Sequence, residues 1–136
     1  MSTDWAAGRR EAALAHEQRL TQARERETAA ARELIAGFLE RVRALGVQPE
    51  PLQARDYSGR GPYRTDRTGW YVRTNRSAAV GEDGLFYVLV VEGGLLARVR
   101  GSHLVASDPP LVLGAGGRDG ESIDLREALA RVAPEV

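Results

Sequence analysis

The sequence predicts an α+β protein with a long N-terminal helix, an antiparallel sheet meander and a short C-terminal helix. No proline interrupts residues 4–45, which favours one continuous helix. Short apolar runs separated by turn residues follow between positions 70 and 91, as in antiparallel strands. Near the chain end, Asp124 stands three residues before Glu127, an acidic variant of the capping box that predicts a helix over 124–132.

The predicted N-terminal helix has start and stop signals. Polar residues at positions 2–4 suit its first turn, and Leu45-Gly46 followed by Pro49 ends it. A helix of about 42 residues is roughly 63 Å long. The remaining body of about 90 residues would be only about 25 Å across. Part of the helix is therefore expected to extend beyond the body.

The two halves of this helix differ in character. A heptad that starts at Ala7 gives an apolar seam in the second half, and Ile35, Phe38 and Val42 are predicted to pack against the chain's own sheet. In the first half the d positions of the heptad are all charged, namely Arg10, Glu17 and Arg24. This change predicts a projecting helical arm over residues 1–30 and a single α+β domain over residues 31–136.

The arm is the preferred functional element. An isolated helix of this length is marginal in water and usually needs a packed apolar face. The candidate partner contacts are Trp5, Leu14 and Leu20. Trp5 has two interpretations, an anchor in a partner's pocket or a ring folded back on Leu14 or the sheet. The predicted function is non-enzymatic protein interaction or self-association through this arm, with a protein partner or a homo-oligomer.

The body is predicted to contain a meander of strands at 70–74, 78–80 and 85–91. Asp83-Gly84 suits the tight turn before the last of these strands. Both faces of 85–91 are apolar, so the long helix should cover one, and the C-terminal helix, a loop or a second protomer the other. Other expected segments are strands at 52–55, 104–106 and 111–113 and a loop at 57–67. The stretch 92–101 is compatible with a helical turn or an edge strand.

Arginines and aromatic residues alternate between positions 57 and 76. Such a pattern can grip phosphates and stack on unpaired bases, which makes nucleic-acid or ribosome-associated binding the alternative function. The other interpretation is a polar loop anchored to the core by its aromatic rings. The candidate nucleic-acid contacts are Arg60, Arg64, Arg67, Arg73, Arg76 and Tyr63.

No catalytic residue, cofactor site or metal site is predicted. Cysteine and lysine are absent, which removes thiolate and Schiff-base chemistry. The glycine-rich loop 114–120 departs from the dinucleotide fingerprint, and Asp119, Glu121 and Asp124 lack EF-hand spacing. His16 and His103 are expected to be structural or solvated. One residual enzymatic site, assembled from Tyr57, Tyr63, His103 and Asp108, stays open at this point.

Composition and charge limit the location and the partners. The chain has 19 basic and 19 acidic residues, so its net charge is zero. Its longest strictly apolar run, residues 85–91, is far shorter than the roughly 20 residues of a membrane-spanning helix. The polar start lacks the apolar core of a signal peptide. These features predict a cytoplasmic protein that does not enter a membrane.

The Gly-Trp-Tyr segment at 69–71 and the stretch from Pro109 to Arg126 carry a resemblance. With them, most of the chain resembles small uncharacterised proteins of GC-rich Gram-positive bacteria. The arginine-only basic content and abundant alanine agree with such a genome. The resemblance implies no activity, cofactor or catalytic residue.

Overall fold

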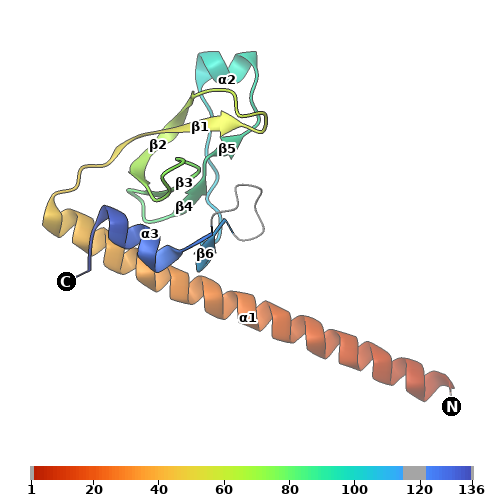
Figure 1. Ribbon diagram of the computed structural model, residues 1–136. Coiled ribbons are helices and arrows are strands. Elements are labelled where there is room, and N and C mark those ends of the chain that lie inside the picture. The colour runs from red at the N-terminus through yellow and green to blue at the C-terminus, as the bar shows by residue number, and fades with distance from the viewer. Residues whose placement is uncertain (1, 115–121, 136) are drawn as a thin grey trace.

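The computed structural model describes residues 2–114 and 122–135, and it confirms the predicted α+β class (Figure 1). The described part of the chain contains one long helix, a five-stranded sheet, a two-stranded sheet and two short helices. In chain order the elements are α1 (Ser2–Leu45), β1 (Glu50–Asp56), β2 (Tyr63–Tyr71), β3 (Ala78–Gly81), β4 (Phe86–Val88), β5 (Val90–Val91), α2 (Leu95–Arg100), β6 (Val112–Leu113), β7 (Ile123–Asp124) and α3 (Leu125–Val132).

Helix α1 ends where the sequence predicts. Gly46 adopts a φ of 71°, a conformation that glycine reaches without a steric penalty. The Val47 N–H donates to the Val42 carbonyl at 2.9 Å, and the Gly46 N–H donates to the Arg43 carbonyl at 3.3 Å. These two bonds form a Schellman motif, which satisfies carbonyls that the helix end would leave unpaired.

The main sheet has the strand order β4-β3-β2-β1-β5. Strands β2, β3 and β4 form the predicted antiparallel meander, and β1 pairs with β2 antiparallel and with β5 in parallel. The prediction of one strand over 85–91 is wrong, because β4 and β5 lie at opposite edges of the sheet. Leu89 connects β4 to β5. Its N–H donates to the Ser77 carbonyl at 2.9 Å, and its carbonyl accepts from the Arg55 N–H at 3.1 Å. The sheet therefore curls until its two edges meet.

Three other segments differ from or refine the predictions. Strand β2 starts at Tyr63, inside the predicted loop 57–67, because Tyr63 is buried and pairs with Ala54 of β1. The undecided segment 92–101 contains helix α2. Residues 104–106 form no strand; Ser107 makes an isolated bridge to Phe86 instead. Val112–Leu113 is a strand, as expected, and it pairs with β7.

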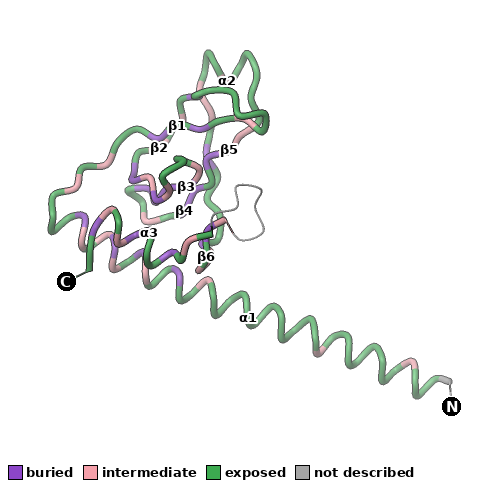
Figure 2. Tube along the Cα trace, viewed as in Figure 1, coloured by how far each residue is buried: buried purple, intermediate pink, exposed green. Residues whose placement is uncertain are grey.

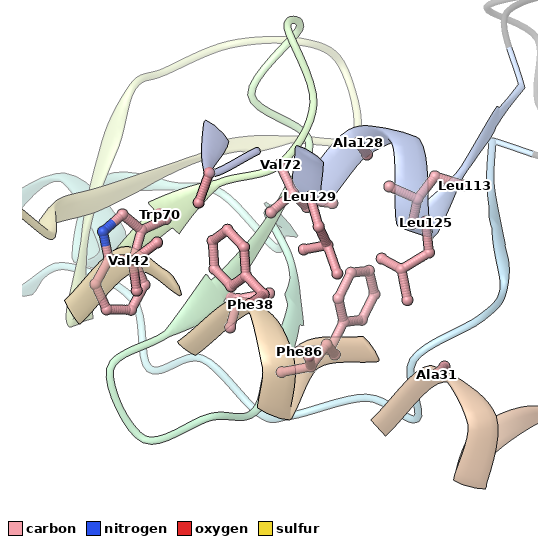
Figure 3. Packing of buried hydrophobic residues seen from close by; sticks show 14 residues of the cluster. Ala31, Phe38, Val42, Trp70, Val72, Phe86, Leu113, Leu125, Ala128 and Leu129 are labelled. Carbon is pink, nitrogen blue, oxygen red and sulfur yellow. The ribbon is translucent and has the colours of Figure 1, made fainter. Parts of the chain in front are cut away.

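The hydrophobic core has two parts. The larger part lies between the helices and the outer face of the curled sheet and contains Ile35, Phe38 and Val42, as predicted (Figure 3). The Phe38 ring meets Trp70 edge-to-face at 5.9 Å between centroids. Residues of the larger part are Ala31, Ile35, Phe38, Val42, Trp70, Val72, Ala78, Val80, Phe86, Leu113, Leu125, Ala128, Leu129 and Ala133.

The smaller part of the core fills the inside of the curled sheet. It consists of Leu52, Ala54, Ala79, Tyr87, Leu89 and Leu104. Of the predicted covers for the second face, a loop contributes Leu104, and the sheet's own curvature supplies the rest. Helix α3 instead packs beside α1 on the first face (Figure 1).

The N-terminal half of α1 projects away from the body (Figures 1 and 2). Along the described helix the first buried residue is Ala31. The body reaches α1 only slightly earlier, at Glu27, which accepts from the Leu111 N–H at 3.3 Å. Just after Ala31, Arg32 pairs with Asp108 at 3.0 Å.

Candidate functional site

The three candidate partner contacts on the arm are all exposed. Trp5 is 65%, Leu14 58% and Leu20 45% exposed. Trp5 does not fold back on Leu14 or the sheet; the guanidinium of Arg9 lies over its ring, 4.4 Å from the centroid. Trp5 and Leu14 are nine residues apart, so they point to opposite sides of a straight helix, about 180° around its axis. The three residues therefore do not share one face.

Tyr63, a candidate nucleic-acid contact, is part of a closed polar cluster. Its buried ring places the hydroxyl 2.9 Å from Asp56 Oδ2, to which it donates. Asp56 Oδ1 also accepts from the Ser58 hydroxyl at 2.6 Å and from the Arg60 N–H at 2.9 Å. The Ser58 bond above all, with the bonds from Tyr63 and Arg60, lowers the pKa of Asp56 to about 2. This ring anchors the 56–63 turn and is not presented for stacking on bases.

The Arg67 side chain likewise makes its contacts within the folded domain. Its guanidinium lies 3.7 Å from Asp83, 3.9 Å from Asp66 and 5.7 Å from the centroid of the Tyr87 ring. Arg76 lies over the ring of Tyr71 at 5.1 Å. These contacts favour the alternative in which part of the arginine-aromatic segment is structural.

The remaining arginines of that segment are separated. Arg73 lines a hollow of about 410 Å³ beside Glu127 and Arg131 of α3. Arg64 lies instead beside α2, where its Nη2 donates to the Val99 carbonyl at 2.8 Å. Because Tyr63 is buried and Arg64 and Arg73 line different hollows, the six candidate nucleic-acid residues are not gathered at one site in the described chain.

Arg64 belongs to a group that the sequence did not reveal. A hollow of about 330 Å³ brings it together with Arg100 and His103; the full lining is Arg64, Thr65, Asp66, Arg100, Gly101, Ser102 and His103. The Ser102 N–H donates to the Arg64 carbonyl at 2.7 Å, and the Asp66 N–H to the Ser102 carbonyl at 3.2 Å. This pairing joins positions almost forty residues apart, which no local pattern predicts.

His103 pairs with Asp66, not with Asp108. Its Nδ1 contacts Asp66 Oδ2, while Asp66 Oδ1 accepts from the Leu104 N–H at 3.0 Å. Burial alone would raise the pKa of Asp66, but the bonds from Leu104 and His103 outweigh it and lower that pKa. Asp108 pairs with Arg32 and Tyr57 is 80% exposed, so Tyr57, Tyr63, His103 and Asp108 are not brought together.

A buried tyrosine completes the polar cluster around Arg67. The Tyr87 hydroxyl donates to Asp83 Oδ2 at 2.5 Å. Burial of the ring, followed by the bond to Asp83 and its negative charge, raises the pKa of Tyr87 from 10.0 to about 12. The folded protein therefore holds a proton that the unfolded chain releases at lower pH.

We expect the free energy of unfolding to fall between pH 10 and about 12 through this group. The stabilisation is complete below the unfolded pKa and is lost as pH rises through the folded pKa. At about 1.4 kcal/mol per pKa unit, the loss is at most about 3 kcal/mol. Urea unfolding across this range measures it: Tyr87→Phe should flatten the slope, and Tyr57→Phe, at an exposed position, should keep it. An unchanged slope in Tyr87→Phe would contradict this assignment.

Two candidate regions lie mainly outside the described residues. These are the glycine-rich loop at 114–120, of which only Gly114 is described, and the carboxylates of Asp119 and Glu121. Within the described ranges no group of three metal-ligating side chains gathers. None of the described helices is both long and apolar enough to cross a membrane.

Comparison of the chain with protein-family models, curated proteins and solved structures found no match.

Proposed function

We propose that this protein is an interaction protein that associates through the N-terminal half of α1, with self-association as the preferred form. One observation carries the proposal: between Thr3 and Arg26 no described residue is buried, yet the segment continues the helix that packs in the core. A solvated helix of this length gains little stability alone, and a packed partner would supply it.

The face of the arm that continues the core face is well defined. Residues 18 positions apart are separated by about five full turns and so lie on the same side of a helix. Counting back from Ala31, Ile35, Phe38 and Val42, this face holds Ala13, Glu17, Leu20 and Arg24. It therefore offers one large apolar side chain, one small residue and two opposite charges.

These charges favour an antiparallel pair of arms. In a parallel pair in register, Glu17 would face its own copy and so would Arg24, which places like charges together. In an antiparallel pair centred near Leu20, Glu17 of each copy meets Arg24 of the other. The apolar contact of Leu20 then lies between two equivalent ion pairs. Charge complementarity thus supports a second copy of this chain as the partner.

Charge reversal tests this arrangement in the full-length protein. Glu17→Arg or Arg24→Glu should weaken the dimer about tenfold, from the loss of two exposed ion pairs worth up to about 1 kcal/mol each. The double variant Glu17→Arg/Arg24→Glu should recover wild-type affinity, because both pairs re-form with reversed sign. Sedimentation equilibrium measures each affinity. Glu11→Arg is the control, since Glu11 lies nine residues from Leu20 and so on the opposite side.

Disulfide trapping reports the direction of the helices. The chain has no cysteine, so each introduced thiol is unique. An equimolar mixture of Glu17→Cys and Arg24→Cys proteins should cross-link to each other in preference to themselves. Preferential Glu17→Cys self-linking would contradict the antiparallel form.

Different results would contradict an interaction role of the arm and its preferred form, self-association. A wild-type protein that stays monomeric at high micromolar concentration contradicts self-association. A second protein retained by the wild type and lost by Leu20→Glu would then still support an interaction role for the arm. Monomeric protein with no arm-dependent partner contradicts both.

Nucleic-acid binding is the second candidate function. The observation in its favour is that Arg64 and Arg100 line the same hollow. Against it, the Tyr63 ring is buried and Arg67 is paired within the fold. Binding of single-stranded RNA that falls steeply with salt and is lost in Arg64→Ala would support it.

A further inference from the structure

The hollow beside α2 is a second distinctive feature of the molecule. Helix α2 lies at the opposite end of the sheet from α1 (Figure 1). Its lining brings two arginines and one histidine together with a single carboxylate, Asp66. An adjoining hollow of about 320 Å³ also borders Arg100 and His103, and adds Glu92 at its margin. The first hollow thus has two guanidinium groups and an imidazole against one carboxylate, and it is unrelated to the arm.

The backbone around the hollow is held by specific contacts. Gly101 has a φ of 80°, and a Cβ there would lie 3.1 Å from the Arg64 carbonyl oxygen, so the close approach of the end of α2 to β2 suits glycine. The Ser102 N–H donates to that same carbonyl at 2.7 Å. These contacts set the positions of residues 100–103 relative to Arg64.

The side chains keep donors available for a ligand. Arg64 uses one nitrogen on the Val99 carbonyl, and a guanidinium carries five N–H groups in all. The Nδ1 atom of His103 contacts Asp66, so the contact does not use Nε2, and the His103 side chain is 71% exposed. Asp66 itself is occupied on both oxygens, by His103 and by the Leu104 N–H. Its charge is therefore partly satisfied before any anion arrives.

We propose that Arg64, Arg100 and His103 form a binding site for a phosphate group, carried by inorganic phosphate or by a small phosphate monoester. Guanidinium groups match the oxygens of phosphate with paired N–H donors and are weakly hydrated. The two arginines face the single carboxylate of Asp66, so the arginines and Asp66 together carry one net positive charge. With His103 protonated, Nδ1–H donates to Asp66 and Nε2–H is a further donor, and the added charge brings the group to the two positive charges that balance a dianion. A volume of about 330 Å³ leaves room for a small group attached to the phosphate.

Proton NMR of the imidazole rings tests this site in the full-length protein. The chain has two histidines, and His16 on the arm is an internal control because it lies far from the hollow. Inorganic phosphate, added at constant ionic strength against sodium chloride, should shift the His103 Hε1 signal saturably and leave that of His16 unchanged. Phenyl phosphate distinguishes the two sources: tighter binding than inorganic phosphate indicates an ester site, and equal binding indicates a site for the free ion.

Matched variants assign the shift to the proposed residues. Arg100→Gln should weaken phosphate binding about tenfold, the loss expected for a charge-assisted hydrogen bond. Arg64→Gln should do the same, although it also removes the bond to Val99. Arg98→Gln changes an arginine on the same helix that does not line the hollow, and should bind like the wild type.

Several results would overturn the proposal. One is a His103 shift that stays linear with phosphate, or that His16 shares. Another is equal weakening in the Arg98→Gln and Arg100→Gln variants, which would indicate nonspecific ionic attraction. Binding of single-stranded RNA at this hollow without any binding of inorganic phosphate or phenyl phosphate would also reject it. Because the arm takes no part, these results are independent of the self-association experiments.

Discussion

Replacing Phe38 by alanine is expected to lower the free energy of unfolding by about 3–5 kcal/mol, the range for emptying a large aromatic site in a core. Phe38 is completely buried between the helices and the sheet, and its ring packs edge-to-face against Trp70. The buried cluster that contains Phe38 draws side chains from α1, the sheet and α3 (Figure 3), so the cavity cannot close by a small shift of one element. Thermal unfolding should move down by about 10–20 °C.

The matched control for Phe38→Ala lies on the same helix. Leu14→Ala also removes a large apolar side chain, but Leu14 is exposed in the arm. Its effect on the unfolding of dilute protein should stay within about 0.5 kcal/mol. Urea unfolding followed by tryptophan fluorescence measures both variants. Equal destabilisation would mean that the arm is packed in the monomer, against the arrangement described above.

Replacing Gly69 by alanine is expected to destabilise the protein by about 3 kcal/mol, at the upper end of the usual range for overpacking. An added Cβ would lie 2.2 Å from the Val80 carbonyl oxygen and 2.7 Å from the Gly81 Cα. Both are backbone atoms of the paired strand β3, so the strands themselves would have to separate. Loss of β2–β3 pairing would open the meander on which Trp70 and Val80 are carried.

A second glycine provides the opposite expectation. Gly37 lies in the middle of α1, and a Cβ there would meet only the end of the Arg41 side chain at 3.4 Å. Alanine is favoured over glycine in a helix interior by about 1 kcal/mol. Gly37→Ala should therefore stabilise the protein, in the same urea assay in which Gly69→Ala destabilises it. The same sign for both variants would contradict this description of the two sites.

The local features of the fold could be predicted from the sequence. The continuity of α1, its end at Gly46 and the burial of Phe38 follow from proline position, glycine conformation and the spacing of apolar residues. The division of 85–91 into two strands could not be predicted, because it depends on the curvature of the whole sheet. A sequence with two apolar strand faces is expected both when other elements cover the two faces and when the curled sheet itself encloses one of them.

The candidate sites were harder to predict for the same reason. Arg67 and Tyr63 look available to a ligand in the sequence, but Arg67 lies beside Asp83 of the turn after β3, and Tyr63 bonds Asp56 across the 56–63 turn. The group formed by Arg64 and His103 needs the pairing of β2 with the segment after α2. Composition identifies which side chains carry charge. Only the tertiary structure determines which of those charges are already matched.

The single unbroken helix also sets a distance. Arms that overlap around Leu20 would place the first core residue of each copy, Ala31, about 11 residues from the centre. At about 1.5 Å per residue, the two Ala31 positions are then roughly 33 Å apart along the helix axes. A straight helix without a proline is stiff, so the number of residues in the arm sets the distance between the two bodies of the dimer. Adding or removing one turn would change the separation of the two bodies by about 11 Å, since both arms change together.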